Sequence, residues 1–179
     1  MAELIHKKEK PLLPSRKRPS RNSVVDWPGD FRSVVLFVTM VTENRMPILD
    51  NAEAVAALEG AWRRFGNWRV GRWIAMPDHV HFFCAPGIWP IPDLQRWLSA
   101  VKSWTARTFP PDAKAMAISR GTGRGRIFQM HAWDTQIRSG AHYSEKWEYM
   151  LRNPVRKGLV ERWEDWPWQG EIHRLFWHD

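Results

Sequence analysis

The sequence contains only one cysteine and two tyrosines, and it has no long hydrophobic run. Its one cysteine, Cys84, excludes an internal disulfide and is typical of a reducing compartment. No apolar stretch approaches the ~18 residues of a membrane-spanning helix, and the charged N-terminus lacks the apolar core of a signal peptide. We therefore predict a soluble, cytoplasmic protein with no membrane partner. Tyrosine occurs only twice, so each copy can be considered singly as a functional residue.

Basic residues outnumber acidic ones, and their distribution is uneven. The chain carries 27 Lys and Arg against 19 Asp and Glu, a net charge of +8, which favours nucleic acid as a polyanionic partner. Residues 1–22 hold seven of the basic side chains and only two Glu. We predict a flexible basic arm over residues 1–25 and one folded domain over 26–179. The arm is either a tether to DNA phosphates, through Arg16, Lys17 and Arg18, or a solubilising tail.

The hydrophobic pattern predicts a mixed α and β domain. β-Branched and apolar runs indicate strands, and apolar residues at helical spacing indicate helices. A helix should follow Asp50, with Glu53 completing a capping box, and Pro154 should end or kink the last helix at Asn153. The predicted elements are a strand over 33–41, a helix over 51–65, strands over 68–75 and 79–84, a helix over 93–107, a strand within 127–138 and a helix over 143–152. The two middle strands are joined by a short turn and should pair antiparallel.

The turn over 76–78 leads into a strand that carries two histidines. Side chains alternate along a strand, so His79 and His81 should share one face. Such a pair is half of a divalent metal site and needs further ligands from elsewhere in the chain. The alternative is that both histidines only fill space beside Phe83.

The last predicted helix places a tyrosine and an asparagine on one side. Tyr149 and Asn153 are four residues apart, so they project in the same direction. If that side packs near the histidines, two imidazoles, an amide oxygen and a phenol surround one point, an arrangement that suits a divalent ion gripping a phosphate. A free phenol has a pKa of about 10 and needs assistance to act as a nucleophile. The alternatives are that Asn153 caps the following turn and that Tyr149 is a surface aromatic.

Two other segments offer basic side chains to a nucleic acid. Arg120, Arg124 and Arg126 lie in a Gly-rich segment that either holds phosphates or is a mobile surface loop. The segment lacks the Lys-Ser/Thr ending of a nucleotide P-loop. In the helix over 93–107, Lys102 lies off the apolar stripe, where it could face a bound strand.

Two motifs together resemble the REP-associated tyrosine transposases, which belong to the single-tyrosine HUH transposase superfamily. The first is Met76-Pro77-Asp78-His79-Val80-His81, and the second is Tyr149-Met-Leu-Arg-Asn153-Pro154-Val155-Arg156-Lys157-Gly158-Leu159-Val160. The resemblance spans roughly residues 33–168 and includes Trp133-Asp134 and the Asp165-Trp166-Pro167-Trp168 run. One departure is Asp78, where the family commonly has Asn; we interpret it as a side chain that serves the turn.

The resemblance implies a ferredoxin-like (RRM-like) antiparallel sheet with helices packed on one face and the histidine strand at its centre. It implies that His79, His81 and Asn153 bind Mg²⁺ or Mn²⁺ and that Tyr149 is the nucleophile. The implied substrate is single-stranded or hairpin DNA with a short flanking guide sequence, cut through a 5′-phosphotyrosine intermediate with a free 3′-OH. Relatives include monomers and homodimers that exchange the tyrosine helix, so both states stay open.

Two other functions fit parts of the sequence. A non-catalytic module could bind single-stranded DNA or RNA with its exposed Trp and Arg side chains. A metal-dependent phosphodiesterase could use water in place of the phenol. A pure binding module has no reason to keep the His-x-His and Tyr-x-x-x-Asn patterns together, which favours the enzyme.

Overall fold

The computed structural model describes residues 34–112, 115 and 126–175. The predicted basic arm, with Arg16, Lys17 and Arg18, lies outside the described residues, as do Arg120 and Arg124. The elements, in chain order, are β1 (Leu36–Val41), η1 (Glu43–Arg45), α1 (Ala52–Arg64), β2 (Trp68–Met76), β3 (His79–Pro86), α2 (Leu94–Thr108), β4 (Trp133–Gln136), α4 (Gly140–Arg156), η2 (Trp163–Asp165) and β5 (Gln169–Glu171).

The five strands form one sheet in the order β4-β1-β3-β2-β5. All four pairings are antiparallel, and the histidine strand β3 lies between β1 and β2. Without β5, the chain order β-α-β-β-α-β and this strand order are those of the ferredoxin-like fold. The predicted α+β class and the antiparallel sheet are therefore confirmed.

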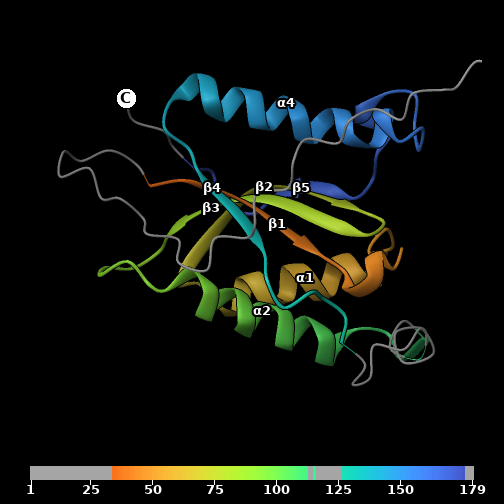
Figure 1. Ribbon diagram of the computed structural model, residues 1–179, viewed down its shortest axis with the longest axis horizontal. Coiled ribbons are helices and arrows are strands. Elements are labelled where there is room, and N and C mark those ends of the chain that lie inside the picture. Colours follow the sequence, from red (N-terminus) through yellow and green to blue (C-terminus); the bar gives the residue numbers. More distant parts are fainter. Residues whose placement is uncertain (1–33, 113–114, 116–125, 176–179) are drawn as a thin grey trace, which may run out of the picture.

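The helices lie on both faces of the sheet. Figure 1 shows α1 and α2 side by side below the sheet and α4 alone above it. The expectation that helices pack on one face thus holds for α1 and α2 and is wrong for α4. The physical reason is that the strands are apolar on both faces over part of their length, so each face needs a cover. The second face carries a core of its own, formed by Val35, Phe37, Ile74, Phe83, Ile137, Met150 and Trp166.

The face below the sheet holds the larger core. Alternate residues of β1 and β3 point to it, among them Val38 and Phe82, and the Trp62 ring of α1 lies 5.2 Å from that of Phe82. The N-cap of α1 is Asn51, whose side chain accepts a hydrogen bond from Ala54, not the predicted capping box after Asp50. The helix therefore begins one residue later than its sequence pattern indicates.

Helix α4 continues past its proline, contrary to the prediction that Pro154 would end or kink it at Asn153. Its end lies at Gly158, which adopts the left-handed conformation with φ +66°. The amides of Gly158 and Leu159 donate to the carbonyls of Val155 and Pro154, which is the Schellman arrangement of a helix end. Because the helix is unbroken at Asn153, that residue stays one turn below Tyr149.

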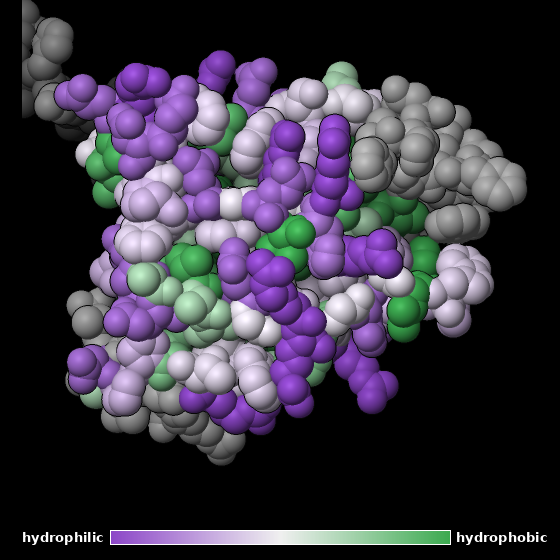
Figure 2. All heavy atoms as spheres, turned by 180° about the vertical axis from the view of Figure 1, so that it is seen from behind, coloured by the Kyte–Doolittle hydropathy of each residue, from purple (hydrophilic) through white to green (hydrophobic). Residues whose placement is uncertain are grey.

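The face of the molecule opposite to that of Figure 1 carries mainly hydrophilic side chains. Figure 2 shows the face seen from behind, where hydrophobic side chains form separate small groups among the hydrophilic ones. In the part of the chain that the structure describes, no helix has the length and apolar character to span a bilayer.

Candidate active site

Two histidines of β3 lie beside each other on the face of the sheet that α4 covers. His79 pairs with Val41 and His81 with Thr39 across the β1–β3 ladder, and Val80 between them points into the opposite core. The two imidazole centroids are 4.7 Å apart and the ring planes are inclined by 79°. The predicted shared face is therefore present in the structure.

One nitrogen of each imidazole is occupied by an oxygen partner. Nδ1 of His79 lies 2.6 Å from Oδ1 of Asp78, and Nδ1 of His81 lies 2.7 Å from Oγ1 of Thr39. When Nδ1 carries the proton in these contacts, Nε2 is the free lone pair on each ring. Nε2 of His81 is buried and has no hydrogen-bond partner within the described residues. A buried nitrogen without a partner is costly, and a metal ion would satisfy it.

Burial also sets the protonation state of the inner histidine. Desolvation lowers the pKa of His81 well below its usual 6.5, and the charge of His79 lowers it further. The neutral imidazole is therefore favoured at neutral pH, and this is the form that ligates metals.

Helix α4 carries the tyrosine to the histidines of the same chain. The Tyr149 ring centroid lies 5.4 Å from that of His81, at an interplanar angle of 69°. The Phe37 ring stacks on His81 at 5.3 Å and contacts the Tyr149 ring edgewise at 6.4 Å. Tyr149 is 42% exposed, so its phenol can contact a polymer on the surface. In this structure Tyr149 and the histidines therefore meet within one copy of the chain.

Asn153 lies one turn further along α4 and is buried. Its side-chain nitrogen donates to the Tyr149 carbonyl at 3.1 Å. That bond uses one donor of the amide and leaves its oxygen without a part in the bond, and Asn153 lines a pocket. Asn153 is inside the helix, so the alternative that it caps a following turn is wrong.

The tyrosine, the histidines and the asparagine line one pocket of about 350 Å³. The full lining is Thr39, Val41, Arg45, His79, His81, Trp133, Tyr149, Asn153, Arg156 and Lys157. Three of these side chains are cationic, and no carboxylate is among them. The guanidinium carbon of Arg156 lies 5.8 Å from the Tyr149 ring centroid. A pocket with this charge favours an anion such as a phosphate.

The donor set can be compared with that of known metal sites. Among the described residues, no three His, Cys, Asp or Glu side chains come together as a metal cluster. The pocket is instead lined by two imidazoles and by Asn153, whose amide oxygen is a possible ligand by its chemistry. Two or three protein ligands leave open positions for phosphate oxygens and water, as in sites where a divalent ion contacts a phosphorylated substrate.

Sequence reasoning missed four of the residues around this pocket. Arg156 follows Tyr149 by seven residues, so the helical period was a usable signal for it. Thr39 and Arg45 carried no local signal, since they reach the pocket only through strand pairing and a turn. Asp78 was interpreted as a turn residue, whereas its carboxylate contacts both His79 and Arg45. Burial raises the pKa of Asp78, but hydrogen bonds with those two side chains outweigh it, so the pKa is well below its usual value.

Two predicted DNA contacts lie elsewhere on the molecule. The Lys102 ammonium donates to the carbonyls of Gln129 and Met130 at 3.0 and 3.1 Å, so it holds the segment before β4. Burial lowers the pKa of Lys102 to about 8. Arg126 is exposed and forms an ion pair of 3.8 Å with Glu43. Their contact with DNA stays a prediction.

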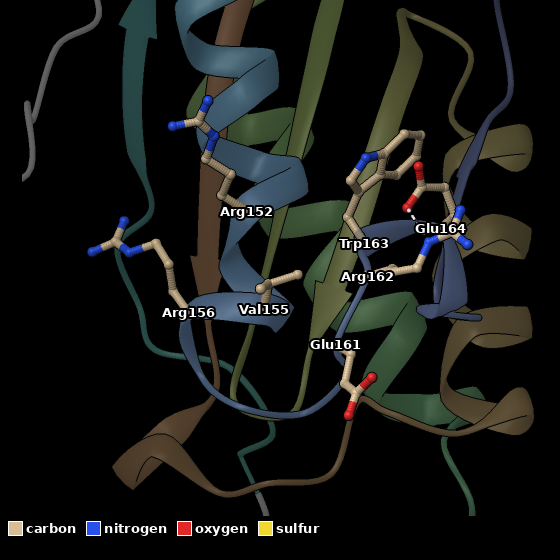
Figure 3. Close-up of a pocket in the computed structure, with 7 residues that line it drawn as sticks. All are labelled: Arg152, Val155, Arg156, Glu161, Arg162, Trp163 and Glu164. Atoms are coloured by element: carbon tan, nitrogen blue, oxygen red, sulfur yellow. Dashed lines mark ion pairs between the residues drawn. The ribbon is translucent and has the colours of Figure 1, made fainter.

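A second pocket, of about 420 Å³, lies between the end of α4 and η2 (Figure 3). Val155 and Trp163 both line it, and Arg152 and Arg156 point away from the indole. Arg162 pairs with Glu164 at 3.6 Å, and Arg152 pairs with Glu148 at 3.4 Å. Two carboxylates, those of Glu161 and Glu164, line this pocket, whereas none is among the residues that line the histidine pocket.

Comparison with known proteins supports the resemblance of the motifs. No family model matches the chain. Over 117 residues it is 26% identical to a protein of Escherichia coli (strain K12) named REP-associated tyrosine transposase, a match that covers 63% of this chain and 59% of that protein. The chain thus spans less than two thirds of the length of this relative. Among solved structures, its fold is similar to that of a REP-associated tyrosine transposase bound to a REP hairpin, with TM-score 0.58, 20% identity and coverage of 77% of this chain and 76% of the other. The predicted similarity to this family is confirmed.

Proposed function

We propose that this chain breaks and rejoins single-stranded DNA through Tyr149, with Mg²⁺ or Mn²⁺ held by His79, His81 and Asn153. The observation that carries the proposal is the meeting of an accessible phenol with two imidazoles in a pocket lined by cations. The similarity to a REP-associated tyrosine transposase, one of which has been solved bound to a REP hairpin, supports hairpin DNA as the substrate.

The reaction is a transfer of a phosphoryl group to the phenol. The Tyr149 oxygen loses its proton and attacks the phosphorus of a phosphodiester, and the bond from phosphorus to the 3′ oxygen breaks. The products are a 5′-phosphotyrosine and a strand end whose 3′ oxygen has taken up a proton. One phosphoester bond replaces another, so a 3′-OH can reverse the step and rejoin DNA without an energy source.

The protein side chains hold the reacting phosphate in place. Arg45, Arg156 and Lys157 attract the DNA backbone to the pocket. Asn153 and the Nε2 atoms of the two histidines fit a divalent ion, which when bound supplies electrophilic assistance to the phosphate. Thr39 orients the His81 imidazole and Asp78 orients the His79 imidazole, each through a contact with the ring Nδ1.

The test is formation of a covalent protein–DNA adduct. The whole 179-residue chain is incubated with Mn²⁺ and a labelled hairpin oligonucleotide with single-stranded flanks, and the adduct is resolved on a denaturing gel. We expect an adduct that Tyr149→Phe abolishes. Tyr143→Phe is the matched control, because Tyr143 is the other tyrosine of the chain and lies on the same helix.

Two outcomes would replace the proposal. Binding of hairpin and unstructured oligonucleotides with no adduct on any of them would indicate a non-catalytic nucleic-acid binding module. Cleavage that survives Tyr149→Phe and is lost in His79→Ala and His81→Ala would indicate a phosphodiesterase that uses water.

A further inference from the structure

The Asp78 carboxylate joins the candidate metal site to an arginine that no motif includes. Its Oδ1 lies 2.6 Å from Nδ1 of His79, and its Oδ2 accepts a hydrogen bond of 2.6 Å from Nη1 of Arg45. Each oxygen therefore has one partner, and the two partners are of different kinds. One is a candidate metal ligand and the other is a fixed cation.

The backbone that presents Arg45 is in an unfavourable conformation. Asn44 and Arg45 have φ of 52° and 51°, in the left-handed region that side chains rarely adopt. Two such residues in succession persist only where the surroundings over-determine them, and such strain is concentrated at functional sites. Here it puts an arginine at the rim of the pocket that contains Tyr149.

The same turn is tied to Asp78 through the main chain. The hydroxyl oxygen of the fully buried Thr42 lies 2.9 Å from the carbonyl oxygens of both Met46 and Asp78, which share its single proton. The amide of Thr42 donates to the Asp78 carbonyl as well, also at 2.9 Å. Side-chain and main-chain bonds thus keep the turn and Asp78 in one fixed arrangement, which accounts for the persistence of the strained backbone.

The Arg45 guanidinium has N–H donors that its bond to Asp78 does not use. An arginine has five N–H donors, and the bond to Asp78 uses one of them. The Arg45 side chain is half exposed and lines a pocket without carboxylates. A guanidinium held at one nitrogen by a carboxylate still has donors with which it can bind the oxygens of a phosphate.

We propose that Arg45 binds a non-bridging oxygen of the scissile phosphate and that Asp78 is the positioning residue that aligns Arg45 with the His79 imidazole. This inference rests on the proposed DNA reaction. It predicts different effects for two changes at one position. In Asp78→Asn the amide oxygen can still accept from His79, but the amide nitrogen cannot accept from Arg45. In Asp78→Ala both contacts are lost.

The first arm of the test measures Mn²⁺ binding by electron paramagnetic resonance, without DNA. We expect Asp78→Ala to weaken Mn²⁺ binding about 10-fold or more, since it removes the partner that orients a ligand. Asp78→Asn and Arg45→Gln should stay close to wild type. Equal weakening by Asp78→Asn and Asp78→Ala, or no effect of either, would overturn the positioning role.

The second arm measures hairpin DNA affinity by fluorescence anisotropy in the Tyr149→Phe background, where no adduct can form. Arg45→Gln should weaken binding about 10-fold, and Asp78→Asn should weaken it similarly. The double variant should lose no more than either single one, because both remove the same contact. Arg63→Gln on α1 removes an equal charge on the far side of the sheet and should change binding little.

These arms separate the inference from the proposed reaction. Arg45→Gln that binds DNA like its parent overturns the phosphate contact, even when wild type forms the adduct. Failure of wild type to form the adduct overturns the reaction, while the Mn²⁺ and affinity arms still decide the roles of Asp78 and Arg45. Thermal melts of each variant within a few degrees of wild type exclude unfolding as the cause.

Discussion

On the face of the sheet that α1 and α2 cover, β1 and β3 contribute apolar side chains, whereas on the face that α4 covers the same strands change from apolar to polar along their length. Phe37 and Phe83 belong to the core under α4. Two residues further toward the pocket, Thr39 and His81 take their places on the same pleat. The candidate site is therefore the end of a core, where apolar packing gives way to polar groups and the single helix leaves room for a pocket. One strand can thus supply stability to one side and chemistry to the other.

Substitutions at neighbouring residues of β3 test most directly whether the two faces of the sheet have different roles. His81→Leu should abolish adduct formation, a loss of at least about 100-fold, because it removes a candidate ligand of the ion that assists the phosphate. Its free energy of unfolding should change by less than about 1 kcal/mol, because leucine fills similar space and the removal of a buried nitrogen without a partner offsets the lost contact with Thr39. Single-turnover adduct assays and urea denaturation measure the two effects. A strongly destabilised His81→Leu with normal Mn²⁺ binding would show that His81 is only a core residue.

Phe82→Ala should produce the opposite result at the adjacent position. Phe82 is fully buried between Trp62 and Trp97, on the face covered by α1 and α2. Its truncation should lower the free energy of unfolding by about 3–5 kcal/mol through lost burial and a cavity. Urea denaturation checks this value, and Mn²⁺ binding of the protein that remains folded should be near normal. A loss below about 1 kcal/mol would mean that this face is not the main source of stability.

Two glycines sharpen the comparison between the helices of the two faces. Gly158 ends α4 with φ +66°, and an added Cβ there meets no atom within 4 Å. Gly158→Ala should therefore destabilise the protein by about 1 kcal/mol from backbone conformation alone. Gly60 is inside α1, where an added Cβ is equally free of contacts, and Gly60→Ala should stabilise by about 0.5–1 kcal/mol. Thermal denaturation of the pair should show shifts of opposite sign, and shifts of the same sign would contradict this assignment.

The smallest effect is expected on the exposed side of α4. Glu148 and Arg152 form an ion pair of 3.4 Å, and both side chains are largely exposed. Glu148→Gln should change the free energy of unfolding by less than about 0.5 kcal/mol, because solvent screens such pairs. A larger loss in urea denaturation would mean that this side is covered by a partner in solution.

The local sequence pattern was sufficient to predict which side chains of a single helix or strand point to the same side. The alternation in β3 predicted that His79 and His81 share a face, and the spacing in α4 predicted the same for Tyr149 and Asn153. It was insufficient at Pro154, where the helix continues to Arg156 although a proline lacks an amide donor and crowds the carbonyl four residues earlier. Met150, Asn153 and Pro154 are buried, so the packing of this turn outweighs the local preference. The cap of α1 was also displaced by one residue, to Asn51, since two adjacent residues could each accept the first free amide.

The sequence by itself determined the alternation of the strands, the face of α4 that carries the phenol, and the family to which the two motifs are similar. Only the tertiary structure decided that α4 covers the histidine face of the sheet, and that Asp78 joins His79 to Arg45. The physical reason lies in the range of the forces involved. Backbone periodicity fixes which side chains of one element point together, whereas the choice of which faces meet depends on the burial of apolar surface by segments far apart in the chain.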